Sequence, residues 1–158
     1  MELTTDIFSL FDKKWALLTA GNKESFNSMT VSWGSLGTLW GKSVATVYVR
    51  TSRYTHEFMD REGFFTLSFF PESCRDKLLV LGTKSGRDMD KMNGSGLEAM
   101  ECAHGVTYRE AELTLVCRKL YMDRLDPAKL EGELREKLYA HDAPHDMYIG
   151  EVTELIRP

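Results

Sequence analysis

The sequence predicts a mainly β protein, an antiparallel barrel with helices at its periphery. Segments with the alternation and β-branched content of strands outnumber segments with helical spacing. Neighbouring strand-like segments suit hairpins, and the strict alternation of strands and helices that builds a parallel sheet is missing. The chain has 158 residues and no internal repeat or linker rich in proline or serine. We therefore expect one domain over residues 1–158.

The expected strands are short and are bounded by turn residues. They are Trp15–Ala20, Phe26–Trp33, Ser43–Arg50, Phe64–Phe70 and Met147–Ile156, with Gly21–Glu24 as the first hairpin turn. Alternation within the third strand places Val47 and Val49 on one face, with Tyr48 and Arg50 on the other. Gly150 predicts a bulge in the last strand. The segment Thr107–Met122 suits either one long strand or a hairpin.

The expected helices are recognised by their ends and by apolar spacing. They are Asp6–Asp12, Tyr54–Arg61 closed by Gly63, Ser73–Leu81 closed by Gly82, and the stretch from Asp126 to Ala140. In the last of these, Pro127 suits a first turn, and leucines recur at positions 130, 134 and 138. Lys84–Gly96 has three glycines and no apolar period, which predicts a surface loop.

Charge and composition exclude several classes of partner. The net charge of -4 offers no general attraction to nucleic acid or to an anionic membrane. The N-terminus has acidic residues before its short apolar run, the wrong order for a signal peptide, and no apolar run is long enough to span a bilayer. Three cysteines without a CxxC pair fit a reducing compartment, so we expect a cytoplasmic protein.

Metal-dependent and hydrolytic chemistry find little support in the sequence. Only His141 and His145 are close in sequence, in HDAPH, and Pro144 opposes the helix that would place them on one face. No GxSxG elbow is present, and no cysteine adjoins a histidine. We therefore expect no metal site and no catalytic acid, base or nucleophile supplied by the protein.

The stretch VRTSRYTHEF combines the end of a strand with the start of a helix. Arg50, Ser52, Arg53 and Thr55 carry hydrogen-bond donors there, and a helix start adds unpaired backbone N–H groups and a positive dipole end. This arrangement suits a phosphate. The alternative is an ordinary N-cap in which Ser52 or Thr55 closes the helix while the arginines face solvent.

Two further stretches allow either a ligand or a plain structural role. In NSMTVSWGS, small hydroxyls alternate with apolar residues, so one strand face could admit a flat ligand or could simply meet solvent. The tract Gly82–Asp88 is glycine-rich and basic but lacks P-loop spacing, so it is either a phosphate contact or a flexible charged loop.

Taken in order, NSMTVSWGS, VRTSRYTHEF, FTLSFF, LGTKSGRDMDK and HDMYIGEV resemble the flavin reductase-like family of FMN-binding split barrels, which includes the flavoredoxins. The resemblance runs from about Phe8 to Val152. It implies an antiparallel split barrel, a homodimer, and one FMN per protomer near the subunit interface. The family varies over Gly96–Arg109 and Asp126–Ala140, so substrate preference does not transfer.

The resemblance also implies roles for particular residues. Asn27, Ser28, Met29, Thr30, Val31 and Ser32 would lie along the flavin ring, and their backbone N–H groups could bond its polar edge. The ribityl phosphate would be held by Arg50, Ser52, Arg53 and Thr55, since a guanidinium meets two phosphate oxygens at once. The flavin's surroundings would be completed by Ser68, Ser85 and Lys91.

His145 matches a histidine that lies beside the nicotinamide in related reductases, although it could also be a plain loop residue. The resemblance then implies an enzyme in which FMN accepts hydride from NADH or NADPH and passes electrons to free flavin or another small acceptor. The alternative is a flavoredoxin-like carrier that serves a protein partner. A less favoured reading is an FMN-binding module without a redox partner.

Overall fold

The computed structural model describes residues 1–87, 90 and 92–158. The strands in this part of the chain are β1 (Ala16–Asn22), β2 (Ser25–Val31), β3 (Gly34–Leu39), β4 (Lys42–Arg50), β5 (Phe64–Phe69), β6 (Ala99–Cys102), β7 (Gly105–Tyr108), β8 (Leu113–Arg124) and β9 (His145–Ile156). The helices are α1 (Ile7–Asp12), α2 (Tyr54–Arg61), α3 (Arg75–Thr83) and α4 (Gly132–Tyr139), with 3-10 turns η1 (Glu72–Cys74) and η2 (Pro127–Lys129).

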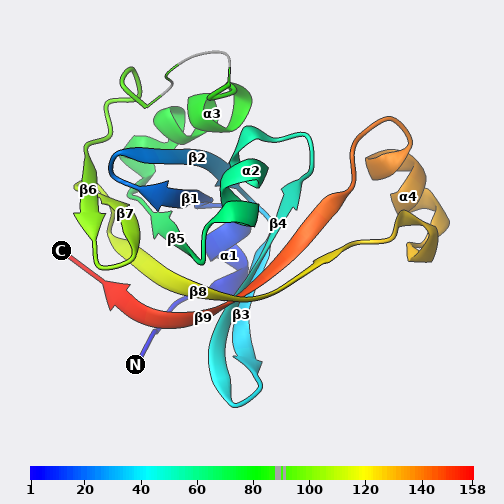
Figure 1. Ribbon diagram of the computed structural model, residues 1–158, viewed down its shortest axis with the longest axis horizontal. Coiled ribbons are helices and arrows are strands. Elements are labelled where there is room, and N and C mark those ends of the chain that lie inside the picture. The colour runs from blue at the N-terminus through cyan, green and yellow to red at the C-terminus, as the bar shows by residue number, and fades with distance from the viewer. Residues whose placement is uncertain (88–89, 91) are drawn as a thin grey trace.

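Seven of these strands form one antiparallel sheet in the order β2-β1-β5-β8-β9-β4-β3, and β6 pairs with β7 separately. The two edge strands, β2 and β3, are consecutive in the chain and are separated only by Ser32 and Trp33. The sheet must therefore curl until its edges approach each other, and Figure 1 shows the strands wrapped in this way. The predicted class, a mainly β antiparallel split barrel with peripheral helices, is confirmed.

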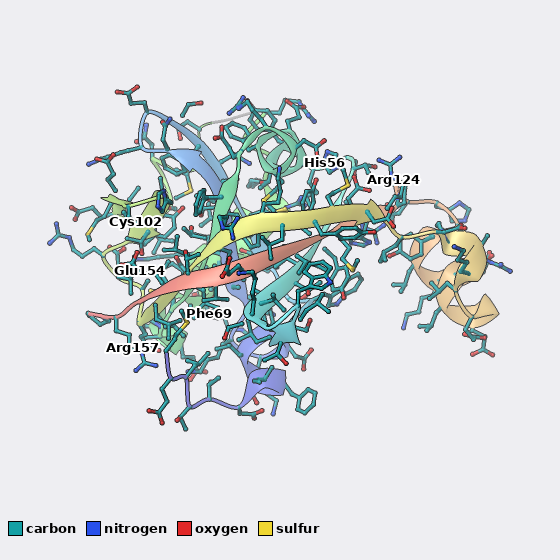
Figure 2. The ribbon with its side chains drawn as sticks, turned by 60° about the horizontal axis from the view of Figure 1, so that its bottom comes forward. His56, Phe69, Cys102, Arg124, Glu154 and Arg157 are labelled. Atoms are coloured by element: carbon teal, nitrogen blue, oxygen red, sulfur yellow. The ribbon has the colours of Figure 1, made fainter. Side chains whose placement is uncertain are left out.

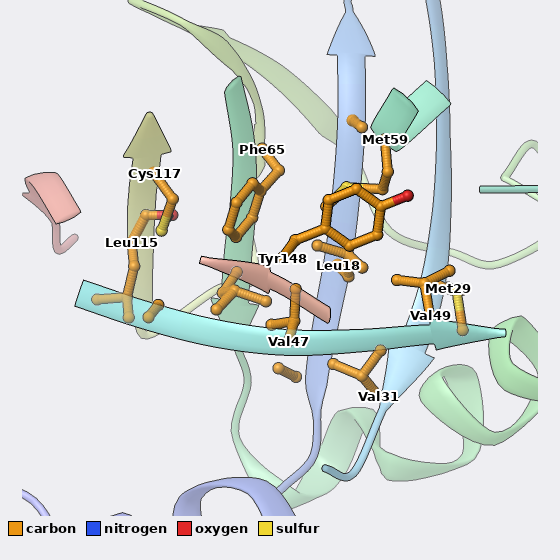
Figure 3. Packing of buried hydrophobic residues seen from close by; sticks show 14 of the residues in the cluster. Leu18, Met29, Val31, Val47, Val49, Met59, Phe65, Leu115, Cys117 and Tyr148 are labelled. Atoms are coloured by element: carbon orange, nitrogen blue, oxygen red, sulfur yellow. The ribbon is translucent and has the colours of Figure 1, made fainter. Parts of the chain in front are cut away.

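The inside of the curled sheet is filled by apolar side chains. Figure 3 shows Leu18, Val47, Phe65 and Tyr148 converging from four strands, and each is at most 1% exposed. On β4, Val47 and Val49 are buried while Tyr48 and Arg50 are only half-buried on the opposite face, as alternation predicts. The outward face of β4 is thereby left available for a site.

Most expected elements are present, with changes at their ends. The expected helix Ser73–Leu81 divides into η1 and α3 and continues to Thr83, so Gly82 lies inside the helix and does not end it. Thr107–Met122 contains two strands that do not pair with each other, because β7 pairs with β6 and β8 lies between β5 and β9. The edge strand β3 was not predicted, since its two glycines weaken the strand pattern.

The bulge expected at Gly150 lies beside it, on the neighbouring strand. Lys119 pairs with Gly150 and Tyr121 with Ile149, which leaves Leu120 of β8 as the extra residue. Gly150 itself is required by close packing. A Cβ there would lie 2.7 Å from the Phe65 ring and 2.9 Å from the Cys117 Cβ.

Residues 125–144, which we call the arm, leave the barrel between β8 and β9. Figure 1 shows the arm reaching away from the sheet, with α4 beyond the ends of the two strands. None of the residues of α4 is buried. In the part of the chain that the structure describes, no helix is long and apolar enough to cross a membrane.

Candidate functional site

The turn between β4 and α2 borders a small pocket of about 90 Å³, which we call the turn pocket. Its walls come from three segments that are distant in the sequence: β2, the start of α2, and the loop after α3. The residues that line it are Asn27, Ser52, Arg53, Tyr54, Thr55, Thr83, Lys84, Ser85 and Gly86. The structure thus brings together five predicted residues: Asn27, Ser52, Arg53, Thr55 and Ser85.

The turn pocket is rich in donors and positive in character. Arg53 is the N-cap residue of α2, and no side chain caps the helix there, so first-turn N–H groups and the positive dipole end are available to a ligand. The Arg53 guanidinium is half-buried and donates to the Gly82 carbonyl at 2.9 Å. Burial lowers the pKa of Arg53, but an arginine stays protonated in proteins. This chemistry suits an anion.

Close packing shapes the other wall of the turn pocket. The Asn27 amide donates to the Thr55 hydroxyl at 2.7 Å, which ties β2 to α2. Gly86 lies so near that a Cβ on it would stand 2.2 Å from Asn27 Oδ1 and 3.2 Å from the Tyr54 ring. Only glycine lets the loop after α3 approach β2 this closely.

The hydroxyls of β2 face neither a ligand nor solvent, contrary to both interpretations of the sequence. Ser28 is fully buried and exchanges hydrogen bonds with Thr19 and Tyr108 at 2.8 and 2.6 Å. The Thr30 hydroxyl donates to the Leu78 carbonyl of α3. On the opposite face, Met29 and Val31 belong to the barrel core.

What β2 can offer a ligand is its backbone. It is an edge strand that pairs with β1 alone, so the N–H and C=O groups on its outer side have no strand partner. Ser32 follows the strand directly and is half-buried. A flat ligand at this edge would meet backbone groups and not the predicted row of hydroxyls.

Three predicted residues do not join the turn pocket. Arg50 faces the arm, where its guanidinium donates to the carbonyls of Ala143 at 2.7 Å and Leu138 at 3.3 Å. Ser68 is fully buried in β5 and hydrogen bonds with Thr114 at 2.8 Å. Lys91 lies outside the residues that the structure describes. The guanidinium at the turn pocket is therefore that of Arg53, not that of Arg50.

A larger cavity of about 650 Å³, which we call the groove, lies between the barrel and the arm. Its lining is mainly aromatic and aliphatic, with a few charged side chains. The residues are Trp33, Tyr48, Arg124, Leu125, Asp126, Pro127, Lys129, Leu130, Leu138, Tyr139, His145 and Met147. A concave apolar site with few polar groups is typical of small-molecule binding.

The predicted substrate residue His145 lines this groove at the start of β9. Its ring lies 5.2 Å from the Trp33 ring, and its Nδ1 is 2.7 Å from the Tyr139 hydroxyl. Burial and then the positive charge of Arg50 lower the pKa of His145 to about 4, against the opposing effect of Asp142. His145 is therefore neutral at pH 7.

The base of the arm is held by a charged cluster next to the groove. Asp146 is 2% exposed and lies 2.7 Å from His56 Nε2 and 2.8 Å from Arg124 Nε. Figure 2 shows Arg124 where β8 passes into the arm. Burial alone would raise the pKa of Asp146, but the bonds from Arg124 and His56 lower it. This network fixes the ends of β8 and β9 that carry the groove.

His56, Asp60 and Asp146 could together offer three ligand atoms to a metal ion, all within 4.8 Å of one another. The sequence gave no hint of this trio, because its members lie on different elements. Their atoms already serve other groups: Arg124 binds Asp146, and the Tyr148 hydroxyl donates to Asp60 at 2.6 Å. The contacts described so far give the cluster a structural role.

Several groove residues were missed by reasoning from the sequence. Trp33 lies within the quoted NSMTVSWGS stretch, and Tyr48 shares its strand face with Arg50, so both had a signal that could have found them. Tyr139 had none, because its approach to His145 depends on how the arm folds back.

Three solved structures illustrate the similarity. The flavoredoxin of Methanosarcina acetivorans is 22% identical, with a TM-score of 0.71 over 100% of this chain and 75% of that one. An FMN-binding protein from Thermus thermophilus, solved with 1-cyclohex-2-enone, is 19% identical, with a TM-score of 0.71 over 99% and 79%. The styrene monooxygenase flavin reductase of Pseudomonas putida S12 is 20% identical, with a TM-score of 0.67 over 95% and 84%. At these identities the likeness shows the fold alone.

None of the curated proteins matches the sequence. The model of the flavin reductase like domain matches residues 8–157, nearly the whole chain, including both pockets. The chain therefore belongs to the flavin reductase-like domain family.

Proposed function

We propose that the protein is an FMN-binding oxidoreductase in which the flavin accepts hydride from NADH or NADPH and passes electrons to a small acceptor. The observation that carries the proposal is the placement of two pockets of opposite chemistry along one segment. Tyr48 lines the groove and Ser52 lines the turn pocket. At about 3.3 Å per extended residue, their Cα atoms are at most about 13 Å apart. This arrangement suits a long ligand with one anionic end.

FMN fits the groups present at both positions. Ser52, Arg53 and Ser85 would hold its phosphate together with the N-terminus of α2. The unpaired backbone edge of β2, ending at Ser32, would bond the polar edge of the ring and favour its reduced, negative form. Bound FMN would supply the redox chemistry, because flavins carry hydride and electron transfer themselves.

The groove would hold the second reactant beside the flavin. Its apolar walls would exclude water, and Trp33 and Tyr48 would confine a planar molecule. His145 is neutral, so it can donate a hydrogen bond without placing a positive charge next to a hydride donor. The protein's task is positioning, and no side chain has to act as an acid or base.

A direct test is to purify the protein, record its visible spectrum with FMN, and mix it anaerobically with NADH or NADPH. Loss of the flavin absorbance within seconds supports the reductase. Stable absorbance with both nucleotides, but rapid loss on mixing with a reduced redox protein, supports the alternative of a flavoredoxin-like carrier. Absence of a flavin spectrum after incubation with FMN contradicts both functions.

We also propose a homodimer with FMN near the subunit interface. Exposed apolar side chains gather at the tip of the β3–β4 hairpin and on β8: Leu39, Trp40, Tyr121 and Met122 are 38–58% exposed. Trp40 packs against Tyr121 with ring centroids 6.3 Å apart. Such a patch is typical of an interaction surface. Analytical ultracentrifugation of wild type and Trp40→Asp tests it: a dimer that dissociates in the variant is expected, and a monomeric wild type contradicts it.

A further inference from the structure

The arm is joined to the barrel at a few points that converge on His145. Although α4 has no buried residue, the carbonyl groups of Leu138 and Ala143 accept hydrogen bonds from Arg50, and Tyr139 reaches the His145 ring. Arg50 and His145 are also paired across β4 and β9. The arm therefore does more than cover apolar surface, because it delivers one hydroxyl to one ring nitrogen.

Tyr139 contacts His145 in a way that orients the whole imidazole. Its hydroxyl lies 2.7 Å from Nδ1, and the two rings meet edge to face, with centroids 5.6 Å apart. The Arg50 guanidinium stands 5.5 Å from the centre of the Tyr139 ring. Tyr139 is thus held from one side by a cation while it bonds the histidine on the other.

The direction of this hydrogen bond follows from the chemistry of the two groups. A neutral imidazole has one N–H donor and one acceptor nitrogen. An imidazole nitrogen accepts more strongly than a phenol oxygen, and the nearby Arg50 cation makes the phenol a better donor. The Tyr139 hydroxyl therefore donates to Nδ1, which places the imidazole proton on Nε2. Among the described residues, no group hydrogen bonds with Nε2.

We propose that Tyr139 is a positioning residue that holds His145 in the Nε2–H form, so that the groove offers one neutral N–H donor to a planar ligand bearing a conjugated carbonyl oxygen. The ligand half rests on the proposed function of the groove. Apolar and aromatic walls suit a flat ring, and a single neutral donor suits an uncharged oxygen. Two sources have this chemistry: the carboxamide of nicotinamide, and the carbonyl of an aromatic or enone acceptor.

The charges around His145 agree with a neutral donor. Arg50 on β4 disfavours the protonated ring and Asp142 in the arm favours it, with burial reinforcing Arg50. Arg124 and Asp146 bind each other in the adjoining cluster. Lys129 and Asp126 lie farther along the groove lining and are of opposite sign. No net charge in the groove therefore calls for an anionic or cationic ring.

The first experiment measures the tautomer without requiring FMN. Long-range ¹H–¹⁵N spectra of ¹⁵N-histidine-labelled protein at pH 7 distinguish Nδ1–H from Nε2–H, and His145→Gln assigns the signal. We expect Nε2–H in wild type. In Tyr139→Phe we expect a mixture of tautomers and a raised pKa of His145, because the bond to the unprotonated nitrogen is lost. Nδ1–H in wild type, or an unchanged spectrum in Tyr139→Phe, overturns the proposal.

The second experiment tests the ligand with FMN-loaded protein. Nicotinamide and p-hydroxybenzaldehyde are titrated separately, with p-cresol as an analogue that lacks the carbonyl. We expect at least one carbonyl probe to shift the His145 signal, and its preference over p-cresol to fall about threefold to tenfold in Tyr139→Phe, the range of a neutral hydrogen bond. The probe that binds identifies the source.

Tyr121→Phe is the matched control, since Tyr121 is exposed and bonds Asp123 outside the groove. Its preference for the carbonyl probe should equal that of wild type. Binding of neither probe, or an unchanged preference in Tyr139→Phe, overturns the ligand assignment. Loss of FMN binding would instead sink the proposed function while leaving the tautomer result intact.

Discussion

The turn pocket and the groove adjoin the same segment of β4 but are built in different ways. The turn pocket is small and lined mostly by polar groups, and four of its members, Ser52 to Thr55, are consecutive in the chain. The groove is several times larger, mostly apolar, and assembled from elements distant in the sequence, with the arm as one wall. The first suits recognition of a fixed anionic group. The second suits a ligand that must exchange.

The two arginines of VRTSRYTHEF divide between these regions. Arg53 borders the turn pocket at the start of α2, whereas Arg50 ties the arm to β4. They are three residues apart and chemically identical, so paired substitutions separate the functions of the two regions. The following predictions use that contrast and run from the largest expected effect to the smallest.

Asp146→Ala should damage the groove side most. It removes the buried carboxylate that binds His56 and Arg124, and loss of one partner from a buried pair costs about 3 kcal/mol. Urea unfolding measures the change in free energy. Glu98→Ala is the control, since it breaks the exposed pair with Arg109 and should cost less than about 1 kcal/mol. Equal losses in the two variants would contradict the structural role of the cluster.

Gly86→Ala should damage the turn pocket alone. The added methyl group would meet Asn27 Oδ1 and the Tyr54 ring, so the loop after α3 must move away from β2. We expect FMN affinity to fall about tenfold, equivalent to about 1.4 kcal/mol, measured by fluorescence titration. Gly94→Ala, where a Cβ meets nothing within 4 Å, should bind FMN as wild type does. A similar loss in both variants would argue against a role for this wall.

Arg50→Ala should loosen the arm and leave the turn pocket intact. The carbonyls of Leu138 and Ala143 lose their donor, so hydrogen exchange of amides in α4 should accelerate about tenfold, or about 1.4 kcal/mol. FMN affinity should change less than twofold. Arg135→Ala, an exposed change on α4, serves as the control. A large loss of FMN affinity in Arg50→Ala would return this residue to the phosphate site.

The pH dependence of stability should report on His145. Its pKa is about 4 in the folded protein, compared with about 6.5 unfolded, so the unfolded chain binds more protons between these values. The contribution of His145 to stability therefore rises as pH increases from about 4 to about 6.5, and is lost as pH falls through this window. Urea midpoints at pH 4.5 and pH 7 should differ less in His145→Gln than in wild type. An equal difference would refute the lowered pKa.

Reasoning from the sequence worked best where the structure depends on local spacing. The strand, turn and helix around Ser52 and Arg53 are continuous in the chain, so their donors could be placed together in advance. The same alternation that buries Val47 and Val49 already places Arg50 on the outer face with Tyr48. That signal was outweighed by the proximity of Arg50 to the turn.

The remaining differences depend on tertiary packing. Ser28 and Thr30 look like open hydroxyls in the sequence, but Tyr108 and α3 cover them. Tyr139 meets His145 only because the arm folds back, and its helix shows no buried residue that could have marked it. Neither contact leaves a periodic trace in the sequence.

The most direct measurement compares FMN with riboflavin, which lacks the phosphate, in wild type and Arg53→Ala. The account predicts that wild type prefers FMN by at least about tenfold, the worth of a charge-assisted contact, and that Arg53→Ala loses most of this preference while Arg50→Ala keeps it. The opposite pattern, with the preference retained in Arg53→Ala and lost in Arg50→Ala, would contradict the turn pocket as the phosphate site.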